Sequence, residues 1–316
     1  MLSRGAENLY WMARHVERAE NTARALDAAF RMALLESAGA DRNSSWASIV
    51  EVGPDPDEFK ERYGTPTAAN VIAYMVTDGE NPSSILSSIG AARENARAER
   101  ARITSELWES LNDTWFAIEG IDEAKLQARG YRSFFEWVKE RTQTFNGVML
   151  GTMLRDEGLH FMELGMFLER ADNTARLVDV KYHVLLPSIA EVGGAADYYQ
   201  WASLLRSLGA LRAYRRIYKG TIVPWQVAEM LILRGDVPRA LHHCYEVVAD
   251  ILDRLGGQGR LPCQQLAHEI YAGLRFGRIE EITRNGLHEF LEEFILENNT
   301  LGRQVQRDFL MADVID

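Results

Sequence analysis

Near the start of the chain, apolar side chains recur at three- and four-residue intervals. These positions are Leu9, Met12, Val16, Ala19, Ala23 and Leu26. This spacing returns side chains to one face of a helix, so it predicts an amphipathic helix with an apolar stripe. The same spacing recurs at Phe161, Leu164, Leu168, Ala171, Ala175 and Val178. Two long helices with matching stripes are therefore expected.

Helical periodicity continues through most of the remaining chain. Further helices are predicted over residues 91–112, 133–153, 200–218, 224–235, 238–257 and 286–311. Asn81 is a candidate helix cap, with Pro82 in the first turn after it. Trp46, Pro54 and Pro56 indicate an irregular connection after the first long helix.

The sequence lacks the marks of a β-protein. Strand-like alternation is absent, and the one Asn-Gly pair, Asn146-Gly147, falls inside helical periodicity. Glycines at 193–194 and 256–259 indicate loops between helices. The predicted fold class is all-α: one domain over residues 1–316, a multi-helix bundle with two related halves, roughly 1–130 and 131–316.

A longer match lies within the two stripes. VERAENTARAL begins at Val16 and LERADNTARLV at Leu168, and seven of the eleven aligned positions are identical. We interpret the match as a duplicated helix. Spacings of four and seven residues align three polar side chains in each copy: Glu17, Asn21 and Arg24 in the first, and Glu169, Asn173 and Arg176 in the second. Arg18 and Arg170 point about 100° away from these faces.

The second copy is predicted to be buried. Met162, Gly165, Met166, Phe167 and Leu177 make its helix apolar nearly all round. A buried charge without a partner costs several kcal/mol, so the charges of the motif need partners. The simplest arrangement has the two copies facing each other, with the carboxylate of one helix held by a guanidinium of the other.

Two interpretations of this polar cluster remain open. It is either a structural network that fixes the packing of the two halves or a pocket for a ligand carboxylate, phosphate or amide. In the second case the catalytic candidates are Glu17, Arg18, Glu169 and Arg170. The ligand-binding candidates in this cluster are Asn21, Arg24, Asn173 and Arg176. Arg93 and Arg97 are further ligand-binding candidates on a separate helix face, which is either an anion-binding stripe or a solvated, internally paired surface. An open cleft would favour a ligand role, whereas a network sealed by Trp11, Phe161 and Phe167 would favour a scaffold.

Charge and composition narrow the range of partners. The chain has 46 acidic and 35 basic residues and a net charge of -11, which argues against nucleic-acid binding. Charges within the first eighteen residues leave no apolar core for a signal peptide, and no apolar run approaches the ~20 residues of a membrane span. Two cysteines, Cys244 and Cys263, are expected to be packed thiols. We therefore expect a cytoplasmic protein without membrane contact.

No cofactor or metal is expected. Glu157 precedes His160 by three residues, the spacing of carboxylate-bridged di-iron bundles, but the second Glu-x-x-His of such sites is missing. A glycine-rich phosphate loop is also missing, which argues against an ATP-dependent ligase acting alone. A third class of function, an assembly module that binds partners through residues 286–311, stays open beside the enzyme and the binding domain.

Several strings together resemble the bacterial Alpha-E family. They are ENLYWMARHVERAENTARAL, NPSSI, ARENAR, ITSELWESLN, LGMFLERADNTARLVD, LRSLGALRAY and VPRAL, in this order along nearly the whole chain. The resemblance assigns the family's Glu-Arg motif to Glu17-Arg18 and Glu169-Arg170. It assigns the middle motif to Arg93, Glu94, Asn95 and Arg97.

The resemblance also implies a context. Members of the family look like partners of circularly permuted ATP-grasp proteins, sometimes fused to them, and they occur beside transglutaminase-like proteases and a proteasome-related peptidase. The implied function is therefore that of a helical component in a system that makes or modifies amide bonds in peptides, with a peptide or amino acid as ligand. The alternative is a non-catalytic scaffold or peptide-binding module whose Glu-Arg pairs are structural.

Overall fold

The computed structural model describes residues 2–35, 44–53, 55–183 and 195–310. This part of the chain forms sixteen α-helices and a final π-helical turn, and it contains no strand. The helices are α1 (Ser3–Leu35), α2 (Ser44–Val52), α3 (Pro56–Tyr63), α4 (Ala68–Val76), α5 (Ile85–Ala98), α6 (Ser105–Ile118), α7 (Glu123–Arg129), α8 (Tyr131–Thr152), α9 (Glu157–His183), α10 (Ala195–Ser207), α11 (Leu211–Tyr218), α12 (Pro224–Leu233), α13 (Leu241–Gly256), α14 (Pro262–Phe276), α15 (Ile279–Asn285) and α16 (Leu287–Val305). The all-α prediction is confirmed.

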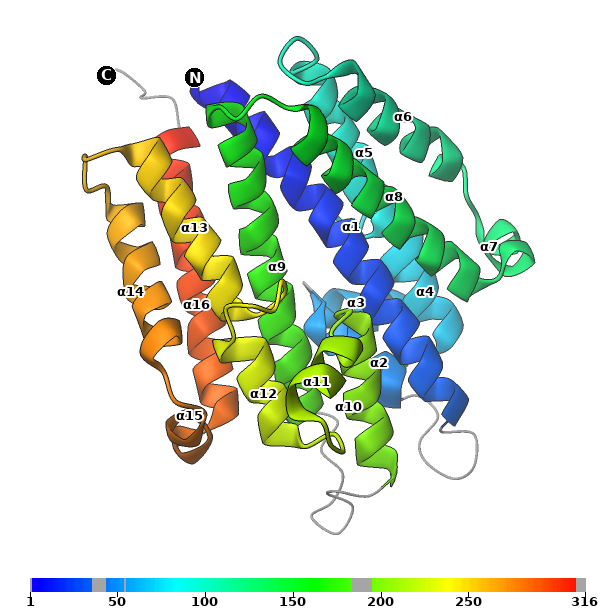
Figure 1. Ribbon diagram of the computed structural model, residues 1–316. Helices are drawn as coiled ribbons and strands as arrows, with labels where there is room; N and C mark the ends of the chain where they lie inside the picture. Colours follow the sequence, from blue (N-terminus) through cyan, green and yellow to red (C-terminus); the bar gives the residue numbers. More distant parts are fainter. Residues whose placement is uncertain (1, 36–43, 54, 184–194, 311–316) are drawn as a thin grey trace.

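Helices α1 and α9 form the centre of the bundle and lie side by side in Figure 1. Helices α5 and α8 pack on α1, and α6 packs on both of them. On the opposite side, α13 and α16 pack on α9, and α14 covers α13 and α16. The two motif copies are therefore carried by the two helices that the rest of the bundle surrounds.

The apolar stripes are buried as predicted. In α1, Leu9, Met12 and Val16 are each at most 1% exposed, and Leu164 and Ala175 of α9 are fully buried. These side chains belong to one continuous core that extends through the whole bundle. The division into two halves near residue 130 stays a prediction.

Two short helices, α2 and α3, lie where an irregular connection was predicted, so that prediction is wrong for residues 44–52 and 56–63. Trp46 lies in α2 and is 2% exposed. Pro56 occupies the first turn of α3, where its missing N–H costs nothing. The Asp55 side chain caps α3 by accepting a hydrogen bond from the Glu58 backbone N–H at 2.9 Å. Pro54 lies outside the described residues.

The predicted helix over residues 91–112 is also corrected. It is two helices, because α5 ends at Ala98 and the Thr104 side chain caps the start of α6. The cap of α5 is Ser84, whose hydroxyl accepts from the Ser87 N–H at 3.0 Å. Asn81 instead lies in the preceding turn, where its side-chain amide donates to the Tyr74 carbonyl at 3.0 Å.

Other segments match the predictions in part. The segment 200–218 breaks at Gly209, which has a positive φ of 69° and separates α10 from α11. Asn146-Gly147 lies within α8, as expected, and Gly256-Gly257 ends α13. Helix α14 was not predicted. The predicted loop at Gly193-Gly194 lies outside the described residues.

Two further expectations concern the cysteines and the membrane. Cys244 and Cys263 are free and fully buried, which confirms packed thiols. Burial raises the pKa of the Cys244 thiol to about 12, so the thiol stays protonated and unreactive at neutral pH. Among the described residues, none of the helices has both the length and the apolar character needed to cross a bilayer.

Candidate functional site

The two motif copies meet where α1 packs on α9, and their Glu-Arg pairs are exchanged. Arg170 donates from Nε and Nη2 to the two oxygens of Glu17, at 3.0 and 2.8 Å. Arg18 donates from Nε and Nη2 to the two oxygens of Glu169, at 2.6 and 3.0 Å. Each carboxylate is thus held in a two-bond fork by the arginine of the other helix, which confirms the facing arrangement.

The Glu17–Arg170 pair is sealed inside the bundle. The Glu17 side chain is 0% exposed, and the Arg170 side chain is 13% exposed. Arg239, just before α13, donates to Glu17 at 2.9 Å and to Glu20 at 2.6 Å. Burial alone would raise the pKa of Glu17, but the charges of Arg170 and Arg239 lower it to about 2.

Arg24 belongs to the same sealed network. Its guanidinium contacts Glu20 at 2.7 Å and donates to the Ser207 carbonyl at 2.8 Å. It therefore holds the end of α10 against α1 and does not line the cavity described next. Arg170 also lies away from that cavity, with its guanidinium over the Phe167 ring at 5.0 Å.

The Arg18–Glu169 pair opens on a cavity of about 360 Å³. Its walls come mainly from α1 and α9, with contributions from α2, α4, the turn before α5 and Asn299 of α16. Its polar lining includes Arg14, Arg18, Asn21, Glu169, Asn173 and Arg176. This volume is within the usual range for a small-molecule site. Five of the ten predicted site residues line it: Arg18, Asn21, Glu169, Asn173 and Arg176.

Arginines outnumber carboxylates along the cavity. Arg14 donates to Glu169 at 2.8 Å, so two guanidinium groups share that carboxylate. Arg176 pairs with Asp172 on its own helix at 2.7 Å. Three arginines and two carboxylates therefore line the space, in a protein whose net charge is -11. The local excess of positive charge favours an anionic ligand group.

Glu169 is ionised at neutral pH. Burial alone would raise its pKa, but the charges of Arg18 and Arg14 lower it to about 2. Nearby, burial and the charge of Arg18 lower the pKa of His15 to about 4, so this imidazole is neutral at pH 7. Carboxylates with such low pKa values are weak proton acceptors.

Asn21 carries a buried amide with one unused donor. The residue is 2% exposed, and its Oδ1 accepts from Arg239 at 3.0 Å. Because a guanidinium only donates, this contact fixes the orientation of the amide. The Nδ2 atom is left without a hydrogen-bond partner, and so is Oδ1 of Asn173 on the facing helix. Both residues line the cavity, and the two unpaired atoms lie buried beside it. Buried polar groups in native proteins normally have partners.

The middle motif is not part of this site. Arg93 and Arg97 lie on α5 and do not line the cavity. Arg93 donates to Asn112 at 2.9 Å, and Arg97 pairs with Glu94 in an exposed ion pair at 2.5 Å. The structure therefore places these two arginines apart from the cavity, on a helix that packs elsewhere on α1, and their ligand-binding role stays a prediction.

The three aromatic residues that were expected to seal the polar network lie in different places. Phe167 covers Arg170 on the sealed side. Trp11 lies 5.0 Å from the Arg14 guanidinium but leaves the cavity open. Phe161 packs against Phe309 instead. One pair thus matches the scaffold interpretation, and the other matches the ligand interpretation.

Two arginines of these networks were not predicted from the sequence. Arg14 lies one helical turn before Arg18, so the four-residue spacing could have found it. Arg239 lies more than two hundred residues from Glu17 and outside both motif copies, so only the tertiary fold brings it to the site.

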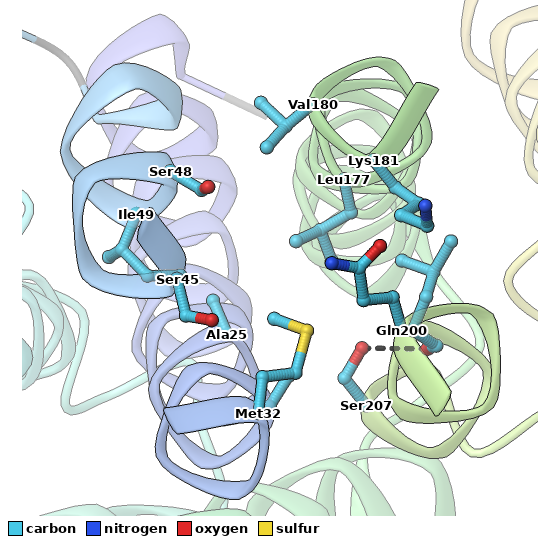
Figure 2. Close-up of a pocket in the computed structure, with 12 residues that line it drawn as sticks. Ala25, Met32, Ser45, Ser48, Ile49, Leu177, Val180, Lys181, Gln200 and Ser207 are labelled. Carbon is cyan, nitrogen blue, oxygen red and sulfur yellow. Dashed lines mark hydrogen bonds between the residues drawn. The ribbon is translucent and has the colours of Figure 1, made fainter. Parts of the chain in front are cut away.

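A second, much smaller cavity borders the first and is drawn in Figure 2. It measures about 40 Å³ and shares Ala25 and Ile49 with the larger one. Figure 2 shows Met32 of α1 facing the α9–α10 side of this space. Lys181 contacts Asp197 at 2.9 Å at its edge. This space holds about one water molecule, so it is a packing gap and not a ligand site. Within the described ranges, no group of three or more potential metal-binding side chains is gathered in one place.

The family comparison agrees with this geometry. A family model described as a predicted alpha-helical domain with a conserved ER motif matches residues 1–310. The chain belongs to the Alpha-E family. The Glu-Arg dipeptide occurs five times in this chain, and the copies at Glu17-Arg18 and Glu169-Arg170 are the two that exchange partners between α1 and α9.

Curated relatives of this Alpha-E chain are longer proteins. Uncharacterised proteins of Mycobacterium bovis and Mycobacterium tuberculosis are each 23% identical to it over 313 residues. The alignment covers 91% of this chain but 34% of each relative, so the chain spans about a third of their length. No solved structure matches the chain.

Proposed function

We propose that this Alpha-E chain is the ligand-binding helical component of a system that makes or modifies amide bonds in peptides. The observation that carries the proposal is the unsatisfied Asn21 amide, which lines an arginine-rich cavity between the two motif copies. Buried polar groups in native proteins normally have partners, so an unused donor beside three arginines supports a ligand with an oxygen-rich anionic group.

The proposed role of the cavity is binding, without acid or base catalysis by its glutamate. A general base works best with a pKa near the operating pH, and Glu169 has a pKa of about 2. Its two arginine contacts suit it to hold Arg14 and Arg18 in place for a ligand. Under this proposal Glu169, Arg18 and Arg14 position and bind, while chemistry takes place on a partner.

The proposed partner is an ATP-grasp-type ligase supplied by another chain or domain. The family resemblance supports this choice, and the chain has no glycine-rich phosphate loop of its own. The greater length of the mycobacterial relatives leaves room for a further domain in those proteins. A transglutaminase-like protease is a second proposed partner on the same grounds.

The sealed pair supports a second role for the same motif. Glu17, Arg170 and Arg239 are buried and mutually satisfied, as expected for a network that fixes packing. A scaffold that presents its outer helices to partners is therefore the alternative function.

The test is co-purification from the native host. The tagged chain at native level should recover an ATP-grasp protein in near-stoichiometric amounts, as measured by mass spectrometry. In a reconstituted ATP-consumption assay, Asn173→Ala should then lower turnover at least fivefold, whereas Arg97→Ala on the exposed α5 face should leave it unchanged. Recovery of the chain without a ligase, or equal turnover in both variants, would contradict the proposal.

A further inference from the structure

The cavity between the motif copies is the middle of three neighbouring hollows. One hollow of about 220 Å³ shares Arg14 with it, and another of about 350 Å³ shares Arg176. Asn299 of α16 borders all three. The three spaces therefore lie next to one another beside α16, and we call them together the α16 groove.

The length of this groove follows from helix geometry. Glu292 lines one end and Arg303 the other, and both lie within α16. Eleven residues at a rise of 1.5 Å each separate them by about 16 Å. An extended peptide advances ~3.3 Å per residue, so the groove has room for about five residues. A single small anion would fill only part of it.

One end of the groove is basic. Arg14 and Arg303 line it together with Trp11, and no carboxylate does. Arg303 is exposed and donates to the Thr300 hydroxyl at 2.9 Å. Among the described residues it has no carboxylate within ion-pair distance, so its guanidinium is available to a ligand.

The other end is acidic. Glu51, Asp179 and Glu292 line it, against Arg176 alone, and Arg176 already pairs with Asp172. Lys60 lies 3.5 Å from Glu51. His288 contacts both Asp179, at 2.6 Å, and Glu292, at 3.5 Å. Even if His288 is protonated, the end has three cationic side chains and four carboxylates. The cations are Arg176, Lys60 and His288, and the carboxylates are Glu51, Asp172, Asp179 and Glu292. The end therefore keeps a net negative charge.

The middle of the groove offers amide groups. Asn21 has an unused donor and Asn173 an unused acceptor, and Asn299 borders the same space. A peptide backbone presents both a carbonyl oxygen and an N–H at each residue. Side-chain amides match both of these groups.

We propose that the α16 groove binds a peptide of about five residues in an extended conformation and in one direction. The C-terminal carboxylate lies at Arg14 and Arg303, and the N-terminal ammonium group lies at Glu292. The amides of Asn21 and Asn173 bind the backbone between them. This assignment names the ligand class of the proposed function and rests on it.

Equilibrium dialysis of the full chain against random pentapeptide pools tests the assignment. Three pools are compared by mass spectrometry: free at both ends, amidated at the C-terminus, and acetylated at the N-terminus. The pool with free ends should be retained at least tenfold more strongly than the amidated pool and about threefold more strongly than the acetylated pool. Random dipeptides with free ends should be retained more weakly than pentapeptides.

Two matched glycine variants separate groove binding from a general effect on folding. A Cβ at Gly302 would sit 3.6 Å from Arg14 and 3.8 Å from the Tyr10 hydroxyl, so Gly302→Leu should fold and fill the basic hollow. Gly273 is exposed in the middle of α14 with nothing near its Cβ position. We expect Gly302→Leu to lose at least nine-tenths of peptide retention and Gly273→Leu to lose none.

The predicted preference for each free end of the peptide is tested by a separate variant. Arg303→Gln should abolish discrimination against the amidated pool, and Glu292→Gln should abolish discrimination against the acetylated pool. Arg278→Gln, at an exposed position on the short loop before α15, is the control for both.

Several results would overturn the assignment. They are equal retention of all pools, no retention of any pool, equal retention of dipeptides and pentapeptides, or full retention by Gly302→Leu. None of these would affect co-purification with a ligase, so the proposed function and this ligand assignment can fail separately.

Discussion

The Glu17–Arg170 and Glu169–Arg18 pairs have the same composition and the same two-bond geometry, yet their surroundings differ. The Glu17 side chain is 0% exposed and has Arg239 as a second arginine partner. The Glu169 side chain is 10% exposed and lines a cavity of about 360 Å³, with Arg14 as its second arginine partner. The repeated motif thus lies once in the core and once beside an open cavity.

The neighbouring elements in the tertiary structure determine the surroundings of each copy of the motif. The segment before α13 brings Arg239 over the first copy, whereas α16 leaves open space beside the second. A sealed ion pair stabilises the fold because each buried charge has a partner of opposite charge. If one residue of the pair is removed, the other charge is left unpaired in an apolar environment. Beside a cavity, water or a ligand can replace the lost contact.

The largest expected effect comes from Glu17→Gln. It leaves the buried Arg170 without its carboxylate partner and Arg239 with Glu20 alone, which should cost about 3–5 kcal/mol of unfolding free energy. Urea denaturation followed by circular dichroism measures this. Glu94→Gln, in an exposed ion pair, is the control and should cost less than about 1 kcal/mol. Equal losses in the two variants would refute the structural role of the sealed pair.

Acid should act on both pairs together. Their carboxyls have pKa values of about 2 when folded, against an ordinary 4.5, so the ionised form of each carboxyl stabilises the folded state at neutral pH. Because the folded pKa is depressed, this stability is present above about pH 5 and is lost as pH falls towards 2.

The measurement is the unfolding free energy as a function of pH. Glu17→Gln should reduce the slope of the unfolding free energy against pH by about half between pH 5 and 2. His15 acts at higher pH, because its neutral buried form loses stability as pH falls from 6.5 to 4. His15→Gln should remove that part of the curve alone. A wild-type curve that is flat below pH 5 would contradict the assigned pKa values.

Glu169→Gln should have a smaller effect on stability. Arg14 and Arg18 keep one amide oxygen as acceptor and border the cavity, so the expected loss is about 1–2 kcal/mol. The cavity also becomes more positive, so peptide with a free C-terminus should be retained more strongly by this variant in dialysis. A loss as large as that of Glu17→Gln would show that the second pair is also structural.

The smallest effect is expected at the middle motif. Arg97 is 69% exposed and contacts only Glu94 on its own helix. Arg97→Ala should change the unfolding free energy by less than about 0.5 kcal/mol and leave peptide retention unchanged. A reduction in retention would mean that α5 takes part in binding after all.

The sequence was informative where local pattern decides structure. The three- and four-residue spacing identified α1 and α9 and their buried stripes, and the repeated motif required opposite charges to meet. Helix ends were less predictable, because Asn81 and Ser84 both have side chains typical of caps and their neighbours decide between them.

The asymmetry of the site was not readable from sequence. The two copies are nearly identical, so no local signal separates the sealed pair from the open one. The distinction comes from Arg239 and Asn299, which lie far along the chain and in no shared motif with Glu17 or Glu169. Arg93 and Arg97 follow a similar local pattern on α5, yet the fold places them away from this cavity.

The most direct test of this division is a pair of double-mutant cycles on the unfolding free energy. One cycle combines Glu17→Gln with Arg170→Gln, and the other combines Glu169→Gln with Arg18→Gln. The account predicts a coupling of about 2–3 kcal/mol in the first cycle and less than about 1 kcal/mol in the second. Equal couplings, or a larger one for the pair beside the cavity, would contradict the claim that one copy of the motif holds the fold and the other serves the ligand.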